Sequence, residues 1–274
     1  ITSSIACTGE LNNDVMTYHT SKDAISAALS KHWKSVFTHK PVCLNTLQAW
    51  ALQDLTPIPH GNWTLSPTHI LNSIRFSKNT SPGPDGIHYS AYKNNKNSLH
   101  ILHRCAQDLQ IRPPELLPKG FNHAFLSCLP KKPSGNHGGT DYYTAEATRP
   151  LSIVDTSNRL LASASRLVAE PHFSQWVSPA QRGFIRGRSM LANILDIDFA
   201  MRVASYAFSK AGLILFDFKA AFPSVSQEFM WATLELIGVP ANVIHSYRAF
   251  YHDNLQRVRF CGYLAEGFKA TSGV

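Results

Sequence analysis

The stretch Leu213-Ile214-Leu215-Phe216-Asp217-Phe218-Lys219-Ala220-Ala221-Phe222-Pro223 holds the candidate chemistry of this chain. Its first four residues are apolar, which indicates a strand buried on both faces. Asp217 follows at once, and a carboxylate at the end of a buried strand is costly unless a cation pairs with it. Phe222 lies five residues farther on, before a helix start. This order can build a metal site beside a shaped pocket. It can equally give a strand-capping acid and a core aromatic, and the stretch alone favours that second interpretation.

Length and composition set the outer bounds. The 274 residues are enough for one large or two ordinary domains, and 44% hydrophobic content is typical of a globular protein. The net charge of +8 suits a polyanionic partner but does not require one. Five scattered cysteines without a CxxC pair indicate reduced thiols in an intracellular protein and argue against zinc. No apolar run approaches the roughly 20 residues that span a bilayer, and no signal peptide is visible.

The N-terminal part predicts helices. Residues 1–15 are polar and predict no element. A helical pattern follows over residues 20–37, with Ile25, Leu29, Trp33 and Val36 on one face. A second helix is expected over 44–55, before the Pro/Gly-rich stretch 56–61, which is the best domain boundary. We therefore expect a helical N-terminal extension over 1–65 and the main domain over 66–274.

The middle of the chain alternates helices, a rigid turn and strands. Helices are expected over 66–74 and 99–109, with the Pro/Gly turn 81–86 between them. Strands are expected over 125–133 and 149–155, paired as a hairpin around a loop at 134–140. Lys131, Lys132 and Arg149 near its tip could clamp phosphates; taken alone, an ordinary solvated hairpin end is the simpler interpretation.

The next segments are a helix over 158–170, ended by Pro171, and a loop over 181–189 with three arginines and two glycines. Ser189 is expected to cap a helix whose apolar stripe is Met190, Ile194, Ile197 and Met201. Asp196 and Asp198 lie on that helix two residues apart, where side chains do not share a face, so we expect both to be solvated.

The C-terminal part predicts a helix over 227–237 capped by Ser226, a second over 241–251, and a short hairpin over 256–268 around Gly262. Helices outnumber strands, and the strands pair as hairpins against helices. The fold class is therefore expected to be α+β.

Five motifs occur in order along the chain: Ser-Pro-Gly-Pro-Asp-Gly at 81–86, Leu-Pro-Lys at 129–131, Arg-Pro-Leu-Ser at 149–152, Gln-Arg-Gly-Phe with Gly-Arg-Ser at 181–189, and Phe-Asp-Phe-Lys-Ala-Ala-Phe at 216–222. Together they resemble the reverse transcriptase domain of non-LTR (LINE-type) retrotransposons. The resemblance covers about residues 66–274 and implies a right-hand polymerase fold, with fingers and part of the palm present.

The resemblance implies an RNA-directed DNA polymerase that uses two Mg²⁺ ions to join a primer 3′-hydroxyl to a deoxynucleotide. Asp217 matches the first catalytic aspartate, a ligand of both metals, and the carbonyl of Phe218 would add a further oxygen ligand. Phe222 matches the aromatic that would clash with a ribose 2′-hydroxyl and so select deoxynucleotides.

The same resemblance implies that Lys131 and Arg149 hold the triphosphate. Arg182, Arg186 and Arg188 would lie along the RNA template or DNA primer backbone. The localisation would be intracellular, with a nuclear location open and the oligomeric state undetermined.

The chain also departs from the family. A second aspartate pair, in a Tyr-Ala-Asp-Asp-like hairpin, has no counterpart, and Asp253 lacks that context. Ser272-Gly273-Val274 resembles the opening of the next motif. We therefore expect a domain that stops part-way, with an unpaired strand at 213–218, poor solubility and little activity alone. No endonuclease is recognisable. The alternative is a decayed retroelement remnant that at most binds nucleic acid or a partner.

Overall fold

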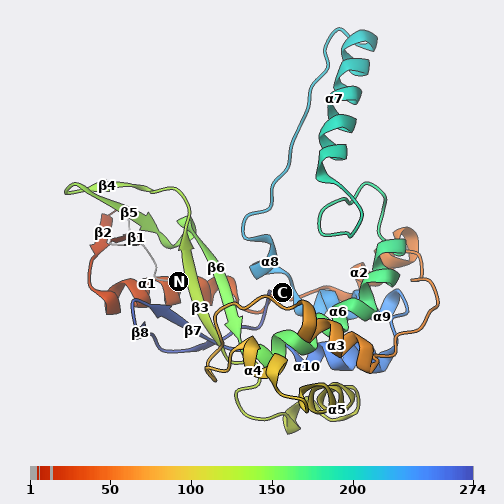
Figure 1. The fold of residues 1–274 in the computed structure, drawn as a ribbon. Helices are drawn as coiled ribbons and strands as arrows, with labels where there is room; N and C mark the ends of the chain where they lie inside the picture. The colour runs from red at the N-terminus through yellow and green to blue at the C-terminus, as the bar shows by residue number, and fades with distance from the viewer. Residues whose placement is uncertain (1–4, 6, 13–14, 274) are drawn as a thin grey trace.

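The computed structural model describes residues 5, 7–12 and 15–273, and it is a mixed α+β structure with two mixed sheets and helices packed beside them (Figure 1). The α+β class expected from the sequence is confirmed. The α-helices are α1 Lys22–Val36, α2 Leu44–Asp54, α3 Pro67–Phe76, α4 Tyr89–Asn94, α5 Ser98–Ile111, α6 Thr156–Trp176, α7 Met190–Ala207, α8 Ala221–Ser224, α9 Gln227–Leu236 and α10 Ala241–Ala249. The strands are β1 Thr8–Asn12, β2 Val15–His19, β3 Ala124–Pro130, β4 Gly135–His137, β5 Thr140–Thr144, β6 Thr148–Val154, β7 Leu255–Phe260, β8 Tyr263–Leu264 and β9 Phe268–Lys269.

The larger sheet has the order β6-β3-β7-β8, with β9 also paired to β7. Strands β3 and β6 are antiparallel over their whole length, from Ala124 opposite Val154 to Pro130 opposite Thr148, so the predicted hairpin is confirmed. Strand β7 runs parallel to β3, which places the predicted C-terminal hairpin against the middle of the chain.

The smaller sheet has the order β2-β1-β5-β4 and includes two regions where the sequence predicted no strand. The segment 1–15 was expected to be featureless, yet its described part supplies β1, which pairs with β2 and with β5. The expected loop at 134–140 contains β4 and the first residue of β5, and these two strands pair antiparallel. Neither segment has the apolar alternation by which strands are recognised, so the prediction failed at both.

Three clusters of buried side chains form the core. The first joins α1 to the larger sheet: Ile25, Leu29 and Trp33 pack on Leu126 and Val258, as the helical pattern predicted. The second gathers α3, α5 and α6, and the third joins α6, α9 and α10 to the segment before α3. The Pro/Gly-rich stretch before α3 contributes to this third cluster, since the Ile58 amide donates to the Ile237 carbonyl at 2.7 Å.

Helix α6 continues through Pro171 instead of ending there, so the predicted helix end was wrong. A proline inside a helix costs about 3 kcal/mol because it lacks an N–H and crowds the preceding turn. The residues beyond it offset that cost: Phe173 and Trp176 pack on the third cluster, and the Trp176 indole donates to the Thr56 carbonyl at 2.7 Å.

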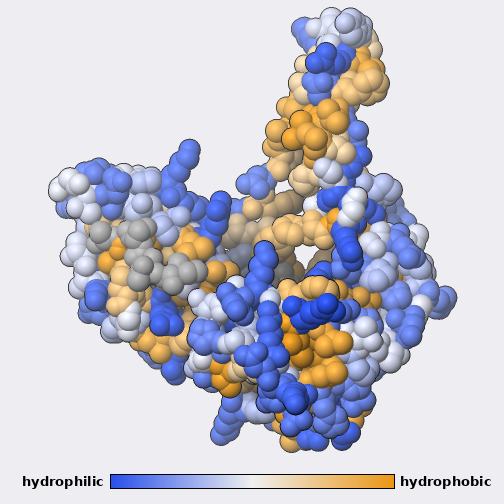
Figure 2. All heavy atoms as spheres, viewed as in Figure 1, coloured by the Kyte–Doolittle hydropathy of each residue, from blue (hydrophilic) through white to orange (hydrophobic). Residues whose placement is uncertain are grey.

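Helix α7 projects from the rest of the molecule, and an extended segment leads back from its far end to α8 (Figure 1). The predicted helix and its Ser189 cap are confirmed, the serine hydroxyl accepting from the Leu191 amide at 3.3 Å. Its apolar stripe, however, is exposed, and Figure 2 shows apolar side chains along the projecting part.

The buried strand predicted over 213–216 is absent from the structure, where these residues have no regular conformation and Phe216 is 87% exposed. A strand needs a neighbour for its backbone N–H and C=O groups, and no described strand pairs with this segment. Over the residues that the structure describes, no helix combines the length and apolarity needed to cross a membrane.

Candidate functional site

The basic end of the β3–β6 hairpin carries two of the predicted nucleotide-binding residues. Arg149 lies on β6 opposite Leu129 of β3, and its side chain is exposed. Lys131 follows β3 directly; its amide donates to the Ala147 carbonyl at 2.8 Å and its ammonium to the Glu146 carbonyl at 3.1 Å. Pairing of β3 with β6 therefore brings the Leu-Pro-Lys and Arg-Pro-Leu-Ser motifs to one edge of the sheet.

Glu146 joins this edge to the loop that carries Asp217. Its carboxylate accepts from the Lys219 ammonium at 2.7 Å. The same hydrogen bond holds the pKa of Glu146 below its usual value. Its neighbour His32 on α1 has a lowered pKa, first because of burial. Glu146 thus connects Lys131, through its backbone carbonyl, with Lys219, through its carboxylate, and it lies outside all five motifs.

Asp217 and Phe218 lie in the exposed segment between α7 and α8. Ala220 adopts a left-handed conformation, with φ 50°, before α8 begins. Non-glycine residues take this conformation at a cost of about 1–3 kcal/mol, and such residues cluster at functional sites. Within the described residues no group of three His, Cys, Asp or Glu side chains could hold a metal ion. The residues around Asp217 therefore do not fit a magnesium site by themselves.

Phe222 connects the Asp217 segment with the arginine- and glycine-rich loop before α7. Its ring meets the edge of Phe184, with centroids 6.0 Å apart and planes at 87°. Both rings are exposed, and Phe184 has φ 61°. The fourth motif is thus in contact with the fifth.

The three arginines predicted to bind nucleic acid differ in their surroundings. Arg182 pairs with Asp196 at 2.6 Å and donates to the Asn193 amide oxygen. Arg188 donates to four backbone carbonyls after Pro171, at Ser174, Val177, Ser178 and Gln181. Two of these bonds satisfy carbonyls at the end of α6, Ser174 in its last turn and Val177 at its C-cap. Arg186 is exposed. Asp196 and Asp198 are exposed, as expected, and both pair with arginines.

The rigid turn at 81–86 packs against the end of β6. A Cβ on Gly83 would lie 2.4 Å from the Asp155 nitrogen, so only glycine allows this approach. The Asp85 amide donates to the Asp155 carboxylate at 3.0 Å, and burial raises the pKa of that carboxyl. Arg159, one turn into α6, donates to Thr80 and to the Ser81 carbonyl. The first motif is thereby fixed to the residues that follow the third.

The C-terminal residues pack beside Phe222. The Ser272 hydroxyl donates to the Pro223 carbonyl at 3.2 Å, and the Gly273 amide donates to the Val225 carbonyl at 2.8 Å. Gly273 has φ 87°, and a Cβ there would lie 2.8 Å from the Pro223 oxygen. Ser272 and Gly273 therefore contact the residues that directly follow the fifth motif.

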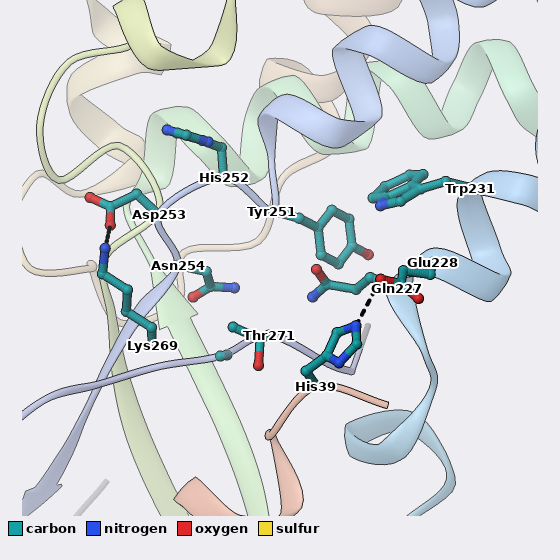
Figure 3. Close-up of a pocket in the computed structure, with 11 residues that line it drawn as sticks. His39, Gln227, Glu228, Trp231, Tyr251, His252, Asp253, Asn254, Lys269 and Thr271 are labelled. Atoms are coloured by element: carbon teal, nitrogen blue, oxygen red, sulfur yellow. Dashed lines mark hydrogen bonds and ion pairs between the residues drawn. The ribbon is translucent and has the colours of Figure 1, made fainter. Parts of the chain in front are cut away.

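A separate groove of about 440 Å³ lies between α9, the segment that follows α10, and the chain around β9 (Figure 3). Its charged side chains are paired, His39 with Glu228 at 2.8 Å and Lys269 with Asp253 at 2.7 Å. Burial raises the pKa of Tyr251. Asp253, the one late acid considered from the sequence, is thus held by a lysine, and the groove has no cluster that could bind a metal among its described residues.

No known protein-family model matches the chain.

Proposed function

We propose that this chain carries the fingers and part of the palm of an RNA-directed DNA polymerase of the non-LTR retrotransposon type. The observation that supports it is the convergence of the five motifs. Strand pairing joins the second motif to the third, and Asp155 and Arg159, which follow the third motif, bond to the first. Glu146 connects Lys131 of the second motif with Lys219 of the fifth, and Phe184 of the fourth motif contacts Phe222 of the fifth. The five motifs are spread over residues 81–222, and their convergence is what one shared site would require.

In this proposal the residues divide the work of nucleotide addition. Lys131 and Arg149 hold the triphosphate through charge-assisted hydrogen bonds. Phe222 excludes a ribose 2′-hydroxyl by contact with its ring. Asp217 supplies one carboxylate for the magnesium ions that this chemistry uses. Further carboxylates are required, and because the described residues include no group of three such ligands, we derive no catalytic step through the metal.

The same observation favours a second candidate, a remnant that binds nucleic acid or a partner without catalysis. Primer extension on an RNA template separates the two. Residues 1–274 alone are expected to give no extension, and robust synthesis that depends on Asp217 would show that one carboxylate suffices. The reading frame that encodes this chain gives a cheaper test: a Tyr-x-Asp-Asp hairpin downstream supports the polymerase, and an early stop supports the remnant.

The role of Phe222 has its own test in any product of that frame that extends a primer. Phe222→Val is expected to admit ribonucleotides while deoxynucleotide addition continues, because the smaller side chain leaves room for the 2′-hydroxyl. Phe218→Val is the matched control, since that side chain has no such role. Unchanged sugar selection in Phe222→Val would exclude Phe222 as the selecting residue.

A further inference from the structure

A cleft of about 500 Å³ lies between α3, α6 and the loop before α7. Its walls include Phe76 at the end of α3, Arg159 and Arg166 on α6, and Arg186 from the loop. Tyr89 lies beneath Arg159, whose guanidinium is 5.0 Å from the ring centroid. No acidic residue is among those that line the cleft. Three guanidiniums in a hollow without carboxylates give a positive potential there.

Two arginines of this cleft, Arg166 and Arg186, keep donors available for a ligand. In the part of the chain that the structure describes, the exposed Arg186 side chain makes no hydrogen bond or ion pair. Arg159 is engaged within the protein, where its guanidinium donates to Thr80, Ser81 and Thr156. Arg166 pairs with Glu170 one turn away on α6, where it remains exposed. The groove of Figure 3 differs, because its Lys269 pairs with Asp253 and its lining includes a second carboxylate, Glu228. An anion would be favoured in the cleft and not in the groove.

The cleft also offers an aromatic face. Phe76 is 73% exposed, although phenylalanine is usually buried in folded proteins. The Arg75 guanidinium lies 5.6 Å from its ring centroid. A basic groove with an exposed aromatic ring is the combination by which proteins hold single strands: cations contact phosphates and bases stack on the ring. A duplex hides the faces of its bases and cannot stack in this way.

We propose that this cleft binds single-stranded nucleic acid, with a base on Phe76 and the flanking phosphates at Arg166 and Arg186. This inference rests on the proposed function, which includes a nucleic-acid partner. It adds the place where a single strand of that partner binds. Of the arginines predicted from sequence, Arg182 and Arg188 are engaged inside the protein. Of these three arginines, only Arg186 lines the cleft. The other two residues proposed to contact the strand are Arg166 on α6 and Phe76 on α3.

The test is fluorescence anisotropy with a labelled single-stranded RNA of about ten nucleotides, without magnesium or deoxynucleotides. The chain is fused to a monomeric solubilising protein whose own binding is measured in parallel. Removing two phosphate contacts in Arg166→Gln/Arg186→Gln is expected to lower the slope of log affinity against log salt by about 0.7 per arginine. Phe76→Ala is expected to weaken binding about tenfold, and to have no effect when an abasic strand replaces the RNA.

The matched control is Arg104→Gln on α5, an exposed arginine that, like Arg166, pairs with an acid four residues away. An equal loss of affinity in this control would show that binding depends on net charge alone. It would overturn the proposal that the cleft is the binding site. Tighter binding of duplex than of single strand, an unchanged slope in the double variant, or no binding by the parent chain would also overturn it. Absence of primer extension would not bear on this result, because the binding assay contains no reaction.

Discussion

Helices α6 and α7 are similar in length and are separated by a single loop, yet their environments are opposite. Helix α6 buries Leu160, Leu161, Ala164 and Val168 and contributes to two core clusters. Helix α7 is more apolar overall and has no buried residue among those described. Helix α7 exposes large apolar side chains beside its charged residues Asp196, Asp198 and Arg202. Helix α6 is therefore packed into the core, whereas α7 and the segment that carries Asp217 are exposed.

The largest difference between the two helices is expected in how much the truncation of a leucine lowers the free energy of unfolding. Leu161→Ala removes a side chain that is 2% exposed and is expected to cost about 2–5 kcal/mol of unfolding free energy. Leu195→Ala makes the same change on α7, where the side chain is 60% exposed, and should stay within about 0.5 kcal/mol. Urea denaturation measures both. Equal losses would show that α7 is packed in solution.

A glycine pair extends the comparison to the loops. In Gly83→Ala the new methyl would meet the backbone of Asp155 at the end of β6, so a loss of about 1–3 kcal/mol or more is expected. Gly212→Ala lies in the exposed segment with no atom within 4 Å and should have little effect. Thermal unfolding compares the two. A neutral Gly83→Ala would contradict the close approach of the 81–86 turn to β6.

The exposed apolar surface should make the chain associate with itself. Large patches of this kind mark interaction sites or aggregation liabilities. Sedimentation velocity is expected to show concentration-dependent association, reduced in Ile194→Lys without loss of thermal stability. Ile101→Lys makes the same substitution at another exposed position, on α5, and should leave association unchanged. A parent chain that stays monomeric at every concentration would refute the exposed arrangement of α7.

The smallest expected effect concerns the link between Glu146 and Lys219. The pKa of Glu146 is lowered mainly by Lys219, so the carboxylate is favoured by folding. The contribution of this pair to the free energy of unfolding is present above the pKa of Glu146 in the unfolded chain. It is lost as the pH falls through the lower pKa of Glu146 in the folded protein. Both side chains are largely exposed, which limits it to about 0–1 kcal/mol.

Carboxyl NMR titration should show the pKa of Glu146 rising towards its ordinary value in Lys219→Gln. The control Lys269→Gln, which removes the partner of Asp253, should leave the Glu146 titration unchanged. Identical titrations in parent and Lys219→Gln would mean that the loop carrying Asp217 is not fixed to the hairpin edge.

Sequence periodicity was sufficient for most helices and for the central hairpin. The face of α1, the serine caps of α7 and α9 and the pairing of β3 with β6 follow from local rules, and the structure has them. The rules failed where distant packing decides. Pro171 remains helical because of the aromatics beyond it, and the 213–216 run lacks the neighbouring strand that its composition requires.

The candidate site shows the same division. Motifs singled out Asp217, Lys131, Arg149 and Phe222, and those predictions remain to be tested. Sequence could not identify Glu146 as the residue between two cations, nor separate Arg186 from Arg188, because both arginines have the same local context. Their difference arises from the end of α6, whose position no local pattern fixed.

The central claim is that the exposed segment carries a polymerase carboxylate at Asp217. The most direct measurement is deoxynucleotide incorporation on an RNA template by the protein expressed from the complete reading frame. Asp217→Asn is compared with Asp196→Asn, an exposed aspartate on α7 that pairs with Arg182. We predict that Asp217→Asn abolishes incorporation and that Asp196→Asn preserves it. Incorporation that survives Asp217→Asn, or a complete frame that incorporates nothing, would contradict the account.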